Sequence, residues 1–137
     1  MPEIAFIMGK SSSGKDHIFK ALIEDETLGL STITMYTTRP MRAGETDGVE
    51  YYFVDDNKAC ELEKNNKIIE MRKYQTVYGE WKYFTADDGQ IEPGMGKRYI
   101  VIGTIEAYNK FVEYFGKECM LPIYIEVEDG LRLQRAI

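Results

Sequence analysis

The feature that most constrains this chain is the run Gly9-Lys10-Ser11-Ser12-Ser13-Gly14-Lys15, which fits the pattern G-x-x-x-x-G-K. An apolar segment, Ile4 to Met8, precedes the run, and a helical pattern follows from about Gly14. Glycines let backbone N–H groups close around a phosphate at a helix N-terminus, and the lysine adds a cation. The pattern therefore predicts a strand, a phosphate-binding loop and a helix.

The loop predicts an ATP site whose residues are Gly9, Lys10, Ser11, Ser12, Ser13, Gly14, Lys15 and Asp16. Lys15 is the predicted catalytic cation for the β- and γ-phosphates. The next position usually carries Ser or Thr, whose hydroxyl binds Mg²⁺, but here it is Asp16. Because a carboxylate also binds Mg²⁺, we predict Asp16 as the metal ligand. The alternative, a strand-to-helix turn that binds no phosphate, is weakened by the joint presence of strand, glycines, lysine and helix.

Alternating apolar strands and helices organise the rest of the chain. Strands are predicted at 4–8, 99–102 and 121–127, each followed by a helical stretch, which indicates a parallel sheet covered on both faces. We expect a core from residues 1–33 and 86–137, with an inserted subdomain of short antiparallel strands at 34–85. Smaller expectations are a strand at 30–36, a helix capped by Thr104 with an apolar stripe that begins at Ile105 and a stop at Gly116, and a final helix from Glu128.

Composition limits the function classes. The net charge is −6, from 17 basic and 23 acidic residues, which argues against a nucleic-acid binder because such proteins need many cationic contacts to phosphates. No apolar run approaches the roughly 18–20 residues of a membrane span. Two distant cysteines without metal-ligand spacing favour reduced thiols in a cytoplasmic protein.

A second motif spans residues 36–53, with the sequence YTTRPMRAGETDGVEYYF. It resembles the GMP-binding segment of guanylate kinases, T-T-R-x-x-R-x-G-E-x-x-G-x-x-Y-x-F, and matches it at every fixed position. The resemblance covers nearly the whole chain and thins after about residue 75. It implies a P-loop NTPase-like α/β fold with a small, mostly-β GMP-binding subdomain. The implied activity is transfer of the γ-phosphoryl group of ATP to GMP with Mg²⁺, giving ADP and GDP in purine nucleotide metabolism.

The acceptor site follows from the same segment. Arg39 and Arg42 lie three positions apart on a turn-rich loop, so both guanidinium groups can converge on one phosphate, with the Tyr51 hydroxyl beside them. Without the resemblance, two solvated surface arginines would be an equally good interpretation. The resemblance also implies that Glu70 reads guanine, because a carboxylate accepts hydrogen bonds from N1–H and the 2-amino group.

Two registers are open for the next contacts. Tyr78-Gly79-Glu80 has the glycine of the family pattern Y-G-S/T but no hydroxyl, whereas Tyr83-Phe84-Thr85 has the hydroxyl but no glycine. We prefer the second, with Tyr83 at the phosphate and Thr85 donating to guanine O6. Thr34 or Tyr36 is a further candidate for the base.

The chain departs from the family in two places. Two aspartates expected after the strand at 99–102 are absent, since the sequence reads Ile102-Gly103-Thr104. Arg132 and Arg135 resemble catalytic arginines that lead into the family's lid, and we expect the lid and later elements to be missing. The chain as given is then expected to fold and bind nucleotide but to turn over slowly. The alternatives are an inactive, protein-binding relative and a kinase for another nucleoside monophosphate.

Overall fold

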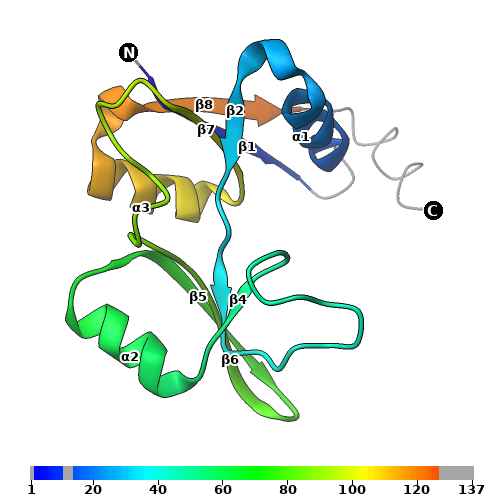
Figure 1. The fold of residues 1–137 in the computed structure, drawn as a ribbon, viewed down its shortest axis with the longest axis vertical. Coiled ribbons are helices and arrows are strands. Elements are labelled where there is room, and N and C mark those ends of the chain that lie inside the picture. The colour runs from blue at the N-terminus through cyan, green and yellow to red at the C-terminus, as the bar shows by residue number, and fades with distance from the viewer. Residues whose placement is uncertain (1, 11–13, 127–137) are drawn as a thin grey trace. The chain divides into compact units, whose positions relative to one another are not determined.

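The computed structural model describes residues 2–10 and 14–126, which form two compact units. The first unit contains Met1–Ile33 and Glu92–Ile137, and the second contains Thr34–Ile91 (Figure 1). The insertion that we expected to end at residue 85 thus continues to Ile91 as a structural unit. The predicted helix from Glu128 lies outside the described residues.

The first unit is built on a parallel sheet. Its strands are β1 (Ile4–Gly9), β2 (Leu30–Thr32), β7 (Arg98–Ile102) and β8 (Met120–Ile125), in the order β2-β7-β1-β8. All three neighbouring pairs are parallel. The α/β fold with a parallel sheet, predicted from the apolar strands, is therefore confirmed.

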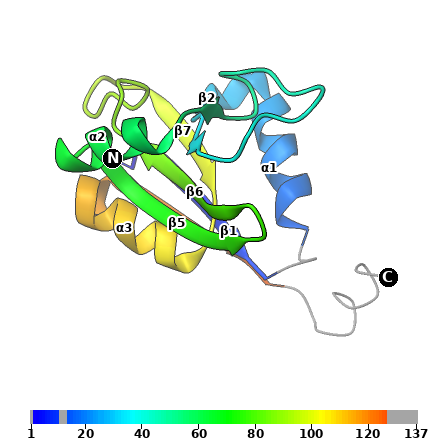
Figure 2. The ribbon, with the colours of Figure 1, turned by 90° about the horizontal axis from the view of Figure 1, so that it is seen from below.

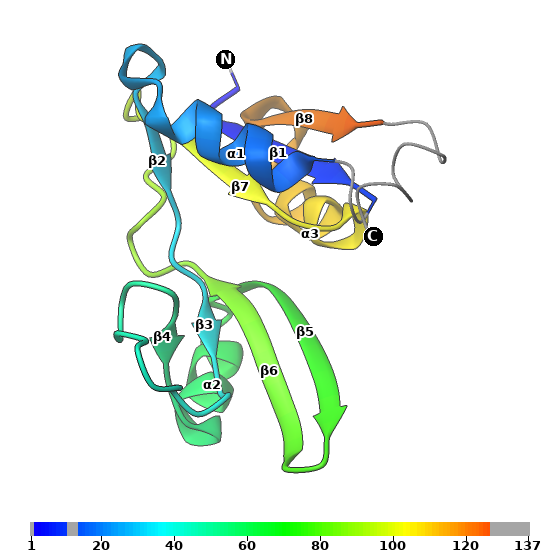
Figure 3. The same ribbon diagram turned by 90° about the vertical axis from the view of Figure 1, so that its right-hand side faces the viewer.

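Helices cover both faces of this sheet. Phe6 and Ile7, adjacent on β1, point to opposite faces, and both are fully buried. One face carries α1 (Lys15–Glu24), which contacts β1, β2 and β7, and the other carries α3 (Ile105–Phe115), as Figure 3 shows. Short 3₁₀ turns, Glu26–Leu28 and Lys117–Cys119, lead into β2 and β8. The core therefore surrounds β1, the strand that ends in the phosphate loop.

The start of α3 shows how the sheet and its helices are fitted together. The Thr104 side chain caps the helix by accepting a hydrogen bond from the Ala107 N–H at 3.1 Å, and the helix ends before Gly116, as predicted. Ala107 and Phe111 are buried, and the rings of Tyr108 and Phe111 pack edge-on against Phe6. The expectation for Ile105 was wrong: it is 51% exposed, because it occupies the first helical position, ahead of the buried stripe.

The second unit has a mixed sheet and one helix. The strands β3 (Tyr36–Thr37), β4 (Tyr52–Phe53), β5 (Ile68–Thr76) and β6 (Gly79–Ala86) have the order β4-β3-β6-β5. The antiparallel strands β5 and β6 form a long hairpin and lie side by side in Figure 2. Helix α2 (Asp56–Lys64) is capped by Asp55, whose side chain accepts from the Lys58 N–H at 2.8 Å. Its Ala59 forms a core with Phe84 and Ala86 on one face of the sheet.

Two expectations for this region were wrong. The strand predicted at 30–36 is divided between the units: β2 ends at Thr32, and β3 begins at Tyr36 in the other sheet. Between them, the Thr34 N–H and C=O bond to the side chain of Gln90 at 2.7 and 2.9 Å, in place of a strand partner. The inserted strands are also not all antiparallel, since β3 pairs with β4 in parallel.

Gly103, which follows β7, gives a stability prediction for the first unit. A Cβ at this position would lie 3.0 Å from Phe6 Cζ and 3.3 Å from Phe6 Cε1. Because Phe6 is fully buried against two other rings, it has little room to move, and we expect Gly103→Ala to cost about 1–3 kcal/mol of unfolding free energy. Urea unfolding measures this cost. The double variant Phe6→Leu/Gly103→Ala should lose less unfolding free energy than the two single variants lose in total. Losses that simply add would contradict the proposed clash.

Candidate functional site

The candidate site in the first unit is the phosphate loop. Strand β1 ends at Gly9, and α1 begins at Lys15 after Gly14, whose φ of 91° is a left-handed conformation that favours glycine. The Lys15 ammonium donates a 2.8 Å hydrogen bond to the Gly9 carbonyl. No ion pair among the described residues involves Lys15, so its charge is not neutralised by a carboxylate there.

The other residues predicted for ATP lie around this turn. Asp16 and Lys10 are exposed, and Asp16 is in the first turn of α1. His17, next along the helix, is also exposed. Among residues 2–10 and 14–126, no group of three or more His, Cys, Asp or Glu side chains could hold a metal ion. Ser11, Ser12 and Ser13 lie outside the described residues.

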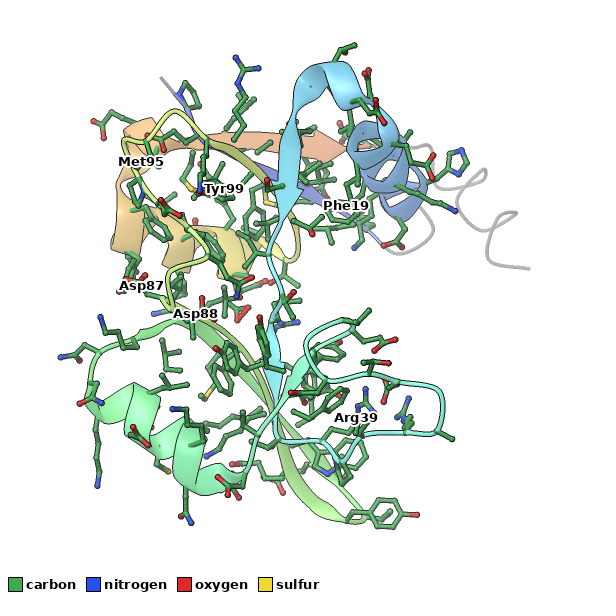
Figure 4. The ribbon with its side chains drawn as sticks, in the orientation of Figure 1. Phe19, Arg39, Asp87, Asp88, Met95 and Tyr99 are labelled. Carbon is green, nitrogen blue, oxygen red and sulfur yellow. The ribbon has the colours of Figure 1, made fainter. Side chains whose placement is uncertain are left out.

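Arg39, in the loop between β3 and β4, is the most constrained cation of the second unit (Figure 4). Only 4% of it is exposed, and both terminal nitrogens donate to the Glu45 carboxylate at 2.9 Å. Its guanidinium carbon also lies 5.6 Å from the ring centroids of Tyr51 and Phe53. This pairing raises the pKa of Arg39 and, with the Arg42 backbone N–H, lowers the pKa of Glu45 to about 2. Arg39 is therefore a fixed, permanent positive charge.

Aromatic rings join Arg39 to the hairpin. The Tyr83 ring on β6 lies 5.6 Å, between centroids, from both Tyr51 and Tyr74. Arg42 is exposed, and its backbone N–H donates to Glu45 at 2.7 Å, so the same carboxylate orders the loop that carries both arginines. The structure thus brings Arg39, Tyr51 and Tyr83 together, with Arg42 on the adjoining turn.

Glu70 and Thr85 are directly opposite each other on β5 and β6. They are 5% and 1% exposed. Strict alternation along β5 would place Glu70 on the same face as Ile68, which packs against α2's core. A register shift between Ile68 and Glu70, characteristic of a β-bulge, instead turns Glu70 to the opposite face, where its cross-strand partner is Thr85.

The protein satisfies this pair only in part. Among the described residues, the buried side-chain polar atoms without a hydrogen-bond partner are Glu70 Oε2, Thr85 Oγ1 and Arg72 Nε. Arg72 Nε lies 3.0 Å from Glu70 Oε1, an ion-pair distance, but without hydrogen-bonding geometry. Burial raises the pKa of Glu70, and Arg72 offsets part of that effect. Unpaired buried polar atoms are rare and costly, so three on adjacent residues indicate a place where a ligand supplies the partners.

The sequence analysis did not identify Arg72, Tyr74 and Trp81 as candidate site residues. With Tyr51 and Tyr83 they line an open pocket of about 380 Å³. Arg72 pairs with Tyr83 and Tyr74 with Trp81 across the two strands, in the same ladder as Glu70 and Thr85. We call these six residues of the ladder the hairpin face; they are Glu70, Arg72, Tyr74, Trp81, Tyr83 and Thr85. Period-two alternation from Glu70 would have revealed the members on β5.

The family model for guanylate kinase matches residues 2–84, more than half of the chain. The chain belongs to the guanylate kinase family. It is 30% identical over 128 residues to a guanylate kinase from Mycoplasma mobile, covering 91% of this chain and 61% of that protein. It is 34% identical over 101 residues to guanylate kinase 2, chloroplastic/mitochondrial, from Oryza sativa, covering 74% and 33%.

The fold is shared with a solved member of the family. A crystal structure of guanylate kinase from Anaplasma phagocytophilum superposes with a TM-score of 0.67 at 24% identity, covering 98% of this chain and 65% of that one. The chain therefore spans less than two thirds of these family members' length.

Other positions considered in the sequence lie outside the hairpin face. Tyr78 is 81% exposed in the hairpin turn, and Glu80 pairs with Gln75 at 3.0 Å, so Thr85 and not Glu80 faces Glu70. Tyr36, suggested with Thr34 as a candidate for the base, lies on the face of the sheet opposite Glu70 and Thr85. Its ring stacks on Phe84 in the core beside α2, and its hydroxyl donates to Asp88 at 2.6 Å.

Gly103 and Thr104 occupy the strand end where the guanylate kinase resemblance led us to expect aspartates, and Glu106 nearby is exposed on α3. The predicted catalytic residues Arg132 and Arg135 lie outside the described residues. No helix in the described part of the chain is long and apolar enough to cross a bilayer.

The buried carboxylate of Glu70 gives a prediction for the ligand-free protein. Because folding raises the pKa of Glu70, the charged form destabilises the fold above that pKa, and the cost disappears below the ordinary pKa of a glutamate. We therefore expect Glu70→Gln to unfold at a higher temperature than the parent at pH 7, with the difference narrowing towards pH 4. Glu80→Gln, an exposed change on the same hairpin, should have little effect. If Glu70→Gln unfolds at a lower temperature than the parent at pH 7, the conclusion that burying this charge destabilises the fold is contradicted.

Proposed function

We propose that this protein is a guanylate kinase that transfers the γ-phosphoryl group of ATP to GMP, giving ADP and GDP. The observation that carries the proposal is the cluster of unpartnered buried atoms on Glu70, Thr85 and Arg72. Guanine presents an N–H at N1 and an acceptor at O6 side by side. A carboxylate oxygen and a hydroxyl on facing residues are the complementary acceptor and donor.

The acceptor phosphate would lie further along the hairpin face. Tyr83 is two residues from Thr85 on β6, about 6.6 Å along a strand, which suits a nucleotide whose base lies at Thr85. Around Tyr83 are the hydroxyl-bearing ring of Tyr51 and the fixed charge of Arg39. Arg42, exposed and with no side-chain hydrogen bond or ion pair among the described residues, would complete the anion site. The remaining N–H groups of Arg39 and the whole fork of Arg42 would bind phosphate oxygens.

The donor site would be the phosphate loop. The Gly14 N–H region and the Lys15 ammonium would bind the β- and γ-phosphates, with Lys15 exchanging its contact to the Gly9 carbonyl for phosphate oxygens. A GMP phosphate is already anionic near neutral pH, so the attacking oxygen needs no general base. Each unit would contribute its own cations: Lys15 would offset the charge of the ATP phosphates, and Arg39 and Arg42 would offset the charge of the acceptor phosphate.

The residues present fit a magnesium ion that arrives with ATP. Mg²⁺ commonly takes one or two protein carboxylates, with phosphate oxygens and waters as its other ligands. Asp16 is exposed in the first turn after the loop and has no ion-pair partner among the described residues, so it would be the protein ligand. When bound, the ion would neutralise phosphate charge.

A coupled assay of ADP formation from Mg·ATP tests this function. ADP should appear only when GMP is added, and Lys15→Ala should reduce the rate by about 10²–10³, because a cation at the transferring phosphate stabilises the transition state. Lys20→Ala, an exposed charge change on the same helix, is the control and should match the parent. No GMP-dependent ADP, or equal rates for Lys15→Ala and the parent, would contradict the proposal.

A further inference from the structure

Two backbone connections join the units, and one side chain links the two connections. The chain passes from the first unit to the second between Ile33 and Thr34, and it returns between Ile91 and Glu92. The Gln90 amide bonds to both polar backbone groups of Thr34: Oε1 accepts from the N–H at 2.7 Å, and Nε2 donates to the C=O at 2.9 Å. A side-chain amide, which carries both a donor and an acceptor, thus takes the place of a neighbouring strand.

Asp88, labelled in Figure 4, holds the Gln90 side chain in this position. Its Oδ2 accepts from Gln90 Nε2 at 3.0 Å, and its Oδ1 accepts from the Gln90 backbone N–H at 3.3 Å. Gly89 between them has a φ of 96°, a left-handed conformation that lets the chain turn back towards the carboxylate. The Gln90 amide is therefore held from its own side of the contact as well as by Thr34.

Tyr36 anchors Asp88 to the packed part of the second unit. Its hydroxyl donates to Asp88 Oδ2 at 2.6 Å, and its ring stacks on the fully buried Phe84, 5.2 Å away between centroids. Burial and the hydrogen bond to Asp88 raise the pKa of Tyr36, so the hydroxyl stays protonated and donates. We call Tyr36, Asp88 and Gln90 the brace. Through it, contacts run without a gap from the core beside α2 to the backbone of Thr34.

The brace has a physical consequence for the connections. Two independent connections can each change their backbone angles alone, whereas two connections tied to one another must change together. Asp88 is exposed, and Thr34 and Gln90 are only half-buried, so water could satisfy the same polar groups without the brace. Satisfying those groups is therefore not a sufficient reason for the arrangement.

We propose that the brace is a conformational restraint, in which Gln90 couples the two connections and narrows the range of positions that one unit can take relative to the other. This inference does not depend on the proposed function, because it concerns the connections and no ligand.

Two measurements on the full chain test the restraint. Exchange of the Thr34 amide hydrogen, followed by NMR, reports whether the bond to Gln90 forms. Pulsed electron paramagnetic resonance reports the spread of distances between one nitroxide on Cys60, exposed on α2 of the second unit, and another in the first unit. The second label uses Lys117→Cys, an exposed position, in a Cys119→Ser background.

Gln90→Ala should affect both readouts. Thr34 exchange should become about 3–10-fold faster, the range of a net hydrogen bond, and the distance distribution should become at least about 1.5-fold broader once the tie is lost. Gln75→Ala, which removes a 3.0 Å bond to Glu80 on the hairpin, is the matched control and should change neither.

Each contrary result is decisive. Unchanged exchange at Thr34 would show that the bond is not formed, and an unchanged distribution would show that it restrains nothing; either would overturn the inference. If Gln90→Ala is poorly folded, Gln90→Glu decides the question, because it keeps the size and the acceptor but loses the Nε2 donor to Thr34 and Asp88. A distribution as narrow as the parent's in that variant would also overturn the inference.

Discussion

The cross-strand pairing of Glu70 with Thr85 is the constraint on which the second unit depends. A β-bulge turns Glu70 away from the core that its neighbour Ile68 packs against, and burial then leaves the carboxylate and the hydroxyl without partners. Such an arrangement destabilises the free protein. It persists because the opposite face of the same strands is held by Phe84, Ala86 and α2. The packed core on one face of the sheet supplies the stability that allows unpaired polar atoms on the other face.

The two ends of this acceptor site are organised in opposite ways. Around Arg39, the charge is paired with Glu45, packed against rings and nearly inaccessible, so the loop that carries the exposed Arg42 is ordered before a phosphate arrives. At Glu70, the polar atoms lack partners until a ligand arrives. An exposed arginine on an ordered loop gives affinity for any phosphate, whereas unsatisfied buried atoms penalise every base that cannot supply their partners. In this account, affinity comes from the loop and selectivity from the hairpin face.

Local patterns in the sequence predicted much of the fold. The glycines and lysine of residues 9–15 indicated the turn from β1 to α1, and the apolar strands indicated the parallel sheet. The strand at 30–36 was wrong because β-branched residues run through the point where the chain leaves one sheet for another. Period-two alternation from Glu70 could have placed Arg72 on the same face as Glu70. Which face that is depends on the bulge between Ile68 and Glu70, which no local pattern marks.

The central claim is that a purine base supplies the missing partners of Glu70. The ¹³C shift of the Glu70 carboxyl carbon, followed against pH with and without saturating GMP, tests it directly. Hydrogen bonds from the base stabilise the charged form, so GMP should move the pKa of Glu70 from a raised value to a clearly lower one. AMP, with no N–H at N1, should not produce this fall. A titration of Glu70 that is unchanged by bound GMP would contradict the account.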